Sequence, residues 1–197
     1  MTIRAGEPWG SQSVVGDDVV TCLDDAELAR SSGDCIVVGG DLWQALGCPP
    51  PPQKGRPCTR VSVDVLICTV DTGAEILVVR AASHVRVGSW LRRGRFVCVT
   101  NAGFVDRRNI APRAHPNDGT LHLLELDPGM AWRERVIARH RSLSGTHVPH
   151  PDITLATRTE WGTTRTGSED LVIDNKTIRR WKSVTVTIDP DALSVLI

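Results

Sequence analysis

The polar side chains best suited to chemistry are concentrated in two loops in the middle of the chain. The first loop, residues 111–119, carries Arg113, His115, Asn117 and Asp118. Two prolines and an Asn-Asp-Gly turn before an apolar run predict a rigid loop that holds these groups at fixed positions. An arginine and a histidine in such a loop are suited to binding a phosphate or a carboxylate.

The second loop, residues 144–151, places His147 and His150 three residues apart with a proline between them. Together with His115 and Asp118, these histidines would supply ligand types that zinc accepts. Their spacing matches no standard zinc signature, and histidines beside prolines also serve as hydrogen-bonding partners of the loop backbone. A metal site and a structural role are therefore both open.

Charge is unevenly distributed along this chain of 197 residues, although the formal net charge is zero. Residues 80–141 carry 12 Lys and Arg against 5 Asp and Glu, whereas residues 1–79 carry 5 against 11. The basic middle predicts an anionic small molecule or lipid headgroup as partner, and we expect no nucleic acid. The alternative is that these arginines pair with the acidic N-terminal third.

Composition indicates a folded, cytoplasmic protein. An apolar content of 41% with 23% charged residues is typical of globular domains. No run reaches the roughly 18 apolar residues of a transmembrane helix, and the start shows no secretory signal. The six cysteines form no CxxC pair. We therefore expect free thiols in a reducing cytoplasm, with a disulfide framework as the alternative.

Short alternating segments predict a mainly β protein. Residues 59–197 are expected to form an antiparallel β-sandwich. One helix is predicted over 128–141, capped by Asp127, with Trp132 and Val136, and Met130 and Ile137, as apolar pairs at helical spacing. The expected strands are 61–67, 75–79, 95–100, 121–126, 153–155, 184–188 and 193–197.

Residues 1–58 differ from the remainder and are predicted to form a small α/β segment. A short helix is expected at 24–30, a strand at 35–38 and a helical turn at 42–46. Pro49 to Pro52 follow, and such a run favours an extended linker. The domain boundary is therefore predicted near residue 58.

Two segments of the chain resemble the C-terminal domain of bacterial diacylglycerol-type lipid kinases. They are Asn101-Ala-Gly-Phe104 through Ala111-Pro-Arg-Ala-His-Pro-Asn-Asp-Gly119, and Leu171-Val-Ile-Asp-Asn-Lys176 through Ile197. They occur in the family's order, and the likeness covers roughly residues 60–197. It implies a stand-alone, diverged β-sandwich of lipid-kinase C-terminal type.

The resemblance also implies roles for single residues. Asp118 matches an aspartate that helps to hold a structural magnesium, but the family's following aspartate is His122 here. Asp174 matches the family's general base for the lipid hydroxyl. The Gly-Glu that follows it in the family is Asn175-Lys176 here, and a lysine would depress the basicity of Asp174. This favours lost or altered catalysis.

The family's ATP-binding motif, Gly-Gly-Asp-Gly-Thr, is incomplete. The chain has Val38-Gly-Gly-Asp41 and then Leu42-Trp43. The missing glycine matters because backbone amides must approach a phosphate closely. ATP is therefore not expected, and the motif is either a remnant or a plain strand-turn-helix.

These observations favour a non-catalytic or accessory module, related to diacylglycerol kinases, that binds an anionic phosphorylated or lipid ligand. Its expected ligand-binding residues are Arg113, His115, Asn117, Asp118, His147 and His150. Two alternatives remain open. One is a phosphotransferase completed by a partner chain that supplies the ATP-binding domain, with Asp174 as catalytic residue. The other is a metal-dependent hydrolase built on the histidine cluster.

Overall fold

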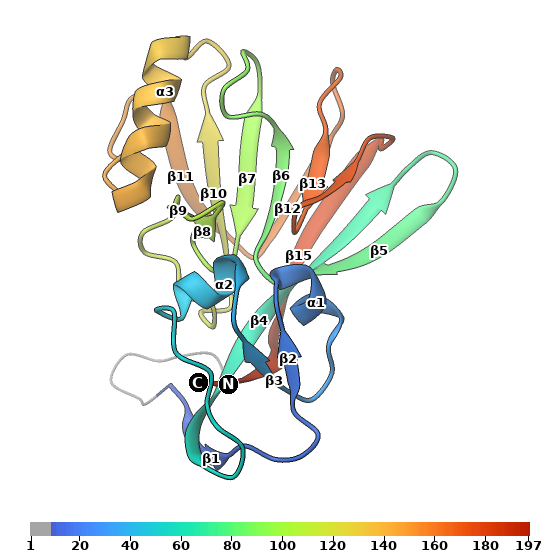
Figure 1. Ribbon diagram of the computed structural model, residues 1–197. Coiled ribbons are helices and arrows are strands. Elements are labelled where there is room, and N and C mark those ends of the chain that lie inside the picture. Colours follow the sequence, from blue (N-terminus) through green and yellow to red (C-terminus); the bar gives the residue numbers. More distant parts are fainter. Residues whose placement is uncertain (1–8) are drawn as a thin grey trace.

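Two β-sheets packed against each other make up most of the molecule (Figure 1). The computed structural model describes residues 9–197. The start of the chain, where no secretory signal was recognised, lies mostly outside these residues. Each sheet buries one apolar face against the other, which is the arrangement of a β-sandwich. The predicted fold class is confirmed.

Two long strands, β4 (Pro57–Asp71) and β15 (Ser183–Leu196), form the centre of the seven-stranded sheet. They pair antiparallel along most of their length and take different neighbours at their two ends. At the sandwich end, β5 pairs with β4 and β12 pairs with β15. At the other end, β1 pairs with β4 and β3 pairs with β15, while β2 pairs with β3. These five strands are β1 (Ser11–Val14), β2 (Val20–Cys22), β3 (Asp34–Val37), β5 (Ile76–Ala81) and β12 (Glu160–Thr164).

The six-stranded sheet has the order β11-β10-β7-β6-β13-β14 and is antiparallel throughout. A small hairpin, β8–β9, lies outside both sheets. The elements are β6 (His84–Gly88), β7 (Phe96–Thr100), β8 (Phe104–Val105), β9 (Arg108–Asn109), β10 (Leu121–Leu126), β11 (Ile153–Arg158), β13 (Leu171–Ile173) and β14 (Lys176–Ile178).

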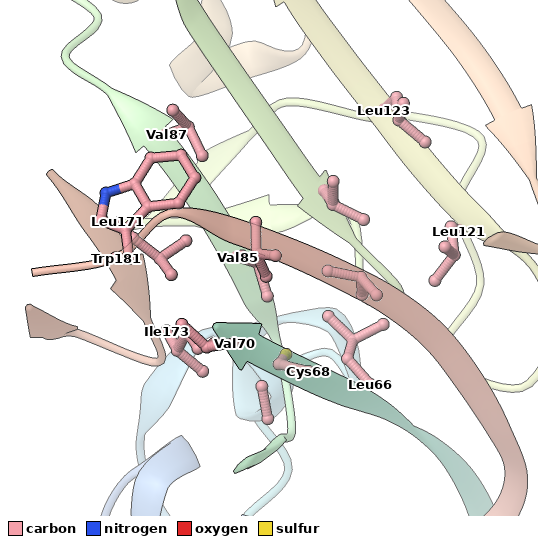
Figure 2. Packing of buried hydrophobic residues seen from close by; sticks show 14 residues of the cluster. Leu66, Cys68, Val70, Val85, Val87, Leu121, Leu123, Leu171, Ile173 and Trp181 are labelled. Atoms are coloured by element: carbon pink, nitrogen blue, oxygen red, sulfur yellow. The ribbon is translucent and has the colours of Figure 1, made fainter. Parts of the chain in front are cut away.

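The main core lies between the two sheets. Leu66, Cys68 and Val70 of β4 meet Val85 of β6 and Leu121 of β10 (Figure 2). All five are fully buried. A second core lies where α1 (Asp25–Arg30) and α2 (Gly40–Ala45) pack on the other end of the seven-stranded sheet. The long strand β4 contributes to both cores.

The predicted α/β segment before the proline run is present, and it is joined to the sandwich by the sheet itself. Strand β3 pairs parallel with β15, with Asp34 opposite Ser194. The run Pro49 to Pro52 has no regular secondary structure, as expected. The N-terminal segment is therefore hydrogen-bonded to the sandwich through β3 and β15, in addition to being joined to it by this linker.

Most of the predicted strands are confirmed, and the C-terminal one is paired rather than frayed. The segments expected at 184–188 and 193–197 belong to one strand, β15, whose pairing with β4 is interrupted between Asp189 and Leu193. Asp191 has a φ of 56° at this bulge. An irregularity of this kind bends a strand while letting it continue.

The predicted helix begins later than expected, and it buries an arginine. Helix α3 spans Trp132–Arg141, because Asp127 accepts a hydrogen bond from Gly129 in a preceding turn instead of capping the helix. Trp132, Val136 and Ile137 are exposed, whereas Arg135 is fully buried. The apolar spacing does not mark the buried face, because it carries no information on the backbone carbonyls that bind Arg135. A short 3-10 helix, η1 (Ser142–Ser144), follows.

Two further expectations concern the environment of the chain. No helix among the described residues is long and apolar enough to cross a membrane. All six cysteines lie in the described range, and each is a free thiol.

Candidate functional site

The two predicted loops converge beside strands β10 and β11 around a hollow of about 700 Å³. Pro112 and Arg113 come from the first loop, and Val148 to His150 come from the second. Strand β10 adds His122 to the wall. The remaining lining is mostly apolar and includes Leu123, Ile153, Leu155 and Ala156. This hollow, called the amphiphilic pocket below, combines basic groups with an apolar floor.

Arg113 is the one arginine or lysine among residues 9–197 that lines this pocket. Within residues 9–197, its exposed side chain makes no hydrogen bond or ion pair. His150 accepts a hydrogen bond from the Asp152 amide on Nδ1, and its Nε2 lies 3.8 Å from the Glu134 carboxylate of α3. Arg113 is therefore free to bind a ligand, and His150 is held in place.

Asp118 holds His122 at the edge of the amphiphilic pocket. Its carboxylate lies 2.7 Å from Nε2 of His122 and accepts hydrogen bonds from the amide and hydroxyl of Thr120. It also accepts one from the His115 amide. Burial acts to raise the pKa of Asp118, but the hydrogen bonds from His122 and Thr120 outweigh burial and lower it. Asp118 thus stays ionised and orients His122.

The surroundings of Asp118 do not fit the magnesium site that the resemblance implies. Magnesium prefers several oxygen ligands, and here both oxygens of the single carboxylate already accept hydrogen bonds. A histidine occupies the position of the second carboxylate. Magnesium at Asp118 stays a prediction, and no step in the function proposed below depends on it.

The other residues predicted to bind a ligand are engaged within the protein. Asn117 is fully buried and donates from its side chain to the carboxylates of Asp64 and Asp191. The His115 ring packs edge-on against Trp9, with 4.4 Å between ring centroids. His147 is buried and bonded to the Ile110 carbonyl oxygen. Among residues 9–197, no three His, Cys, Asp or Glu side chains are grouped to hold a metal ion.

Asp174 lies in the tight turn between β13 and β14, where Ile173 pairs with Lys176. Asp174 and Asn175 both have positive φ, 41° and 67°, as the favoured two-residue hairpin turn requires. The carboxylate accepts hydrogen bonds from the amides of residues 82, 83 and 84 and from the Ser83 hydroxyl. Burial nevertheless raises its pKa. Both oxygens of Asp174 are thus used to hold the turn before β6.

The Gly-Gly-Asp motif lies at the start of α2. Two carboxylates accept hydrogen bonds from backbone amides of the motif and its surroundings. Asp25 of α1 accepts from the amides of Asp41 and Leu42 at the start of α2. Asp41 accepts from the amides of Asp106 and Arg107 in the β8–β9 turn. Burial raises the pKa of Asp25 to about 7 and also raises that of Asp41. The amides that would face a phosphate are therefore bound to an internal carboxylate.

A second hollow of about 800 Å³ borders this motif and is called the acidic cleft below. Its wall includes Gly39, Asp41 and Asn175, so the structure brings the Gly-Gly-Asp motif and the Asp174 turn together. Behind it lies His84, whose Nδ1 is 3.5 Å from the Asp41 carboxylate. Burial lowers the pKa of His84 to about 4, so this contact involves a neutral imidazole at neutral pH.

Asp25, Asp64 and His84 are buried polar residues near these sites that sequence reasoning missed. Asp25 follows Asp24, which caps α1 in the usual way by accepting from the Glu27 amide. Asp25 has no such local role, and this was the signal in the sequence that could have identified it as bound to a more distant group. Asp64 interrupts the apolar run of β4 and accepts from the amides of Gly119 and Asp191. A carboxylate inside a buried strand is rarely without such partners.

Comparisons with solved structures agree with this geometry at the level of fold. A crystal structure of a diacylglycerol kinase from Bacillus anthracis str. Sterne superposes with a TM-score of 0.57 and 11% identity, covering 90% of this chain and 74% of that one. Two further diacylglycerol kinase structures from the same organism give TM-scores of 0.59 and 0.58 at 10% and 11% identity, and they also cover 90% of this chain. The matches cover 77% and 76% of those two chains.

No protein-family model matches the sequence, and no curated protein matches it. The protein is thus mainly β and similar in fold to bacterial diacylglycerol kinases. Residues 59–197 make up less than 90% of the chain. The part that matches the kinase structures, at 90% of the chain, therefore includes part of the α/β segment before the prolines. At such identities, the likeness concerns the fold alone.

Proposed function

We propose that this chain is a non-catalytic, accessory module of lipid-kinase-like fold that binds an anionic amphiphile in the amphiphilic pocket. The supporting observation is that Arg113, His122 and His150 meet over an apolar floor in a hollow of about 700 Å³. A phosphorylated or acidic lipid would place its headgroup at Arg113 and its chain against Leu123, Ile153 and Leu155. A few polar groups on a mostly apolar wall are typical of such ligand sites.

Charge favours this pocket over the acidic cleft. The lining of the cleft contains Asp24, Asp25, Asp41 and Asp106 against one arginine, Arg107. A phosphate entering there would meet an excess of negative charge. Within residues 9–197, no carboxylate lines the amphiphilic pocket.

Two contacts support the non-catalytic part of the proposal. A nucleotide phosphate at α2 would have to displace the Asp25 carboxylate from the amides of Asp41 and Leu42. A general base must have a free oxygen to take a proton, but Asp174 already accepts four hydrogen bonds. A phosphotransferase completed by a partner chain that supplies the ATP-binding domain would still need the hydrogen bonds to Asp174 to break, which makes it the weaker alternative. The hydrolase alternative has no clustered metal ligands among residues 9–197 to support it.

The proposal also covers setting and partners. Six free thiols are in keeping with a reducing cytoplasm. As an accessory module, the chain would present its bound lipid to a separate protein that carries a kinase domain, and ATP would bind to that partner.

Thermal unfolding with three matched ligands tests the pocket. Octanoyl lysophosphatidate has a phosphate and a chain, octanoylglycerol has only the chain, and glycerol 3-phosphate has only the phosphate. A ligand that binds only the native state at 100 times its Kd stabilises it by about 2.7 kcal/mol. We expect a raised melting temperature with the lysophosphatidate alone, because binding needs both Arg113 and the apolar floor.

Two variants locate the effect. Arg113→Ala should abolish the shift while leaving the unliganded melting temperature within about a degree, because Arg113 is exposed and has no partner among residues 9–197. Arg180→Ala is the matched control, since Arg180 is also exposed and lies outside the pocket. A shift that survives Arg113→Ala, or an equal shift with glycerol 3-phosphate, would contradict the proposed pocket.

A further inference from the structure

Helix α3 has an unusual distribution of polarity. Arg135 is fully buried, whereas Trp132 is 57% exposed and Ile137 is 44% exposed. The guanidinium of Arg135 donates to five backbone carbonyls, including those of Arg92 and Gly94. The helix is thus attached to the body by the hydrogen bonds of a buried cation, and its large apolar side chains face outward.

The outward apolar side chains are concentrated around α3. Val136 and Leu143 of α3 and η1 are exposed like Trp132 and Ile137. Leu91 is also exposed, and it lies close to α3 because Arg135 binds the carbonyls of the residues on either side of it. Figure 1 shows α3 at the end of the molecule away from the termini and the α/β segment. A grouped set of exposed apolar side chains indicates an interaction site more than single exposed residues do.

Basic residues accompany these apolar side chains. Arg133, His140 and Arg141 are exposed on α3, and Arg92 and Arg93 are exposed on the loop held by Arg135. The one acid of the helix is Glu134, which lies 3.8 Å from His150 of the amphiphilic pocket. The exposed side of α3 with residues 91–93 and Leu143, called the α3 face below, is therefore apolar and positively charged.

We propose that the α3 face docks on an anionic lipid bilayer. A short helix with tryptophan and aliphatic side chains beside arginines is suited to lie in the interface of a membrane, with apolar groups among the acyl chains and cations at the headgroups. At 10 residues, α3 lies on such a surface rather than crossing it. A second copy of this chain fits less well, because a symmetric contact would bring arginines against arginines.

This inference goes beyond the ligand proposed above and does not need it. Docking requires the α3 face, whereas ligand binding requires Arg113 in the amphiphilic pocket. Arg113→Ala should therefore leave membrane docking unchanged. Loss of vesicle binding would overturn the docking proposal alone, and loss of ligand-induced stabilisation would overturn the pocket proposal alone.

Co-sedimentation with lipid vesicles tests docking. We expect the full chain to bind vesicles of phosphatidylcholine with about one third phosphatidylglycerol and to bind pure phosphatidylcholine much more weakly, with affinity falling as salt rises. Trp132→Ala should weaken binding by roughly tenfold or more, since a tryptophan contributes a large apolar area. Arg133→Ser should weaken it by about fivefold, the size expected for one basic residue at an anionic surface.

Control variants separate the α3 face from general stickiness. Ile76 and Val78 of β5 are 67% and 68% exposed and lie outside the α3 face, so their joint replacement by serine should leave binding unchanged. Circular dichroism verifies that each variant is folded. The proposal is overturned if the wild type ignores anionic vesicles, if Trp132→Ala binds like the wild type, or if sedimentation velocity shows a dimer that Trp132→Ala dissolves.

Discussion

The buried guanidinium of Arg135 offers the sharpest test of how this fold is held together. Its Nη1 donates to the carbonyl of Arg92 at 2.7 Å, and its Nη2 donates to those of Gly94 at 2.7 Å and Asp127 at 2.9 Å. Longer bonds reach the carbonyls of Trp90 and Met130. One side chain thus fastens α3 to the β6–β7 loop and to the turn after β10.

Replacing Arg135 by alanine leaves these five carbonyls without their donor. Leaving a buried acceptor without its donor costs about 1–3 kcal/mol for each group, and the loss of the buried guanidinium charge offsets part of that cost. Water entering the vacated space would restore some bonds, so we expect a loss near 3 kcal/mol in the free energy of unfolding. Arg135→Lys keeps the charge but offers fewer donors without the planar fork, and we expect about half that loss.

Urea denaturation followed by tryptophan fluorescence measures this loss, with the slope of the transition as a check that unfolding stays cooperative. Arg133→Ala is the matched control on the same helix, and it should change stability by no more than about 0.5 kcal/mol because Arg133 is exposed. If Arg135→Ala costs less than about 1 kcal/mol, the bonds to the carbonyls do not fasten α3, and the account of the α3 face loses its basis.

Two further predictions concern the buried carboxylates. Because burial raises the pKa of Asp25 to about 7, its contribution to stability is present below its ordinary pKa near 4 and is lost as pH rises through 7. Between pH 5 and 8, the free energy of unfolding of the wild type should therefore fall by about 2–3 kcal/mol relative to that of Asp25→Asn, at 1.36 kcal/mol per pKa unit. Urea titrations measure this difference, and parallel pH profiles of the two proteins would refute the prediction. Asp174→Ala should cost about 2–3 kcal/mol in the same assay by freeing buried amides, whereas Asn175→Gly, at a φ of 67°, should be neutral or slightly stabilising. Unchanged stability in Asp174→Ala would argue that this carboxylate is kept for chemistry instead.

The sequence predicted those parts of the fold that depend on local patterns. Alternation identified β5, β7 and β10 nearly to the residue, and the end of β15 was expected to be paired, as it is. The local sequence pattern could not show that β4 and β15 extend through both the sandwich and the α/β segment. That continuity follows from partners far along the chain, and strand alternation reports which face is buried but not which strand lies beside it.

The residues of the predicted site fall into two groups in the structure, those that line the pocket and those that are bonded within the protein. The long-range contacts that divide them cannot be predicted from local sequence. Arg113 and His150 were predicted as ligand-binding residues of two separate loops, and both line one pocket. Asn117 and His147 looked equivalent to them, but their partners are Asp64, 53 residues away, and Ile110, 37 residues away. A polar residue in a rigid loop can serve the ligand or the scaffold, and only long-range contacts decide between them.

The buried carboxylates connect the two parts of the molecule in a way that bears on its function. Asp25 and Asp41 link α1, α2 and the β8–β9 turn, while β4 and β15 extend from one part to the other with a bulge between Asp189 and Leu193. A phosphate entering the acidic cleft at the start of α2 would have to displace a buried carboxylate from the backbone amides that donate hydrogen bonds to it. In the amphiphilic pocket, Arg113 has no such internal partner among residues 9–197. This difference is an argument, beside charge, for the proposal that an anionic ligand binds beside β10 and β11.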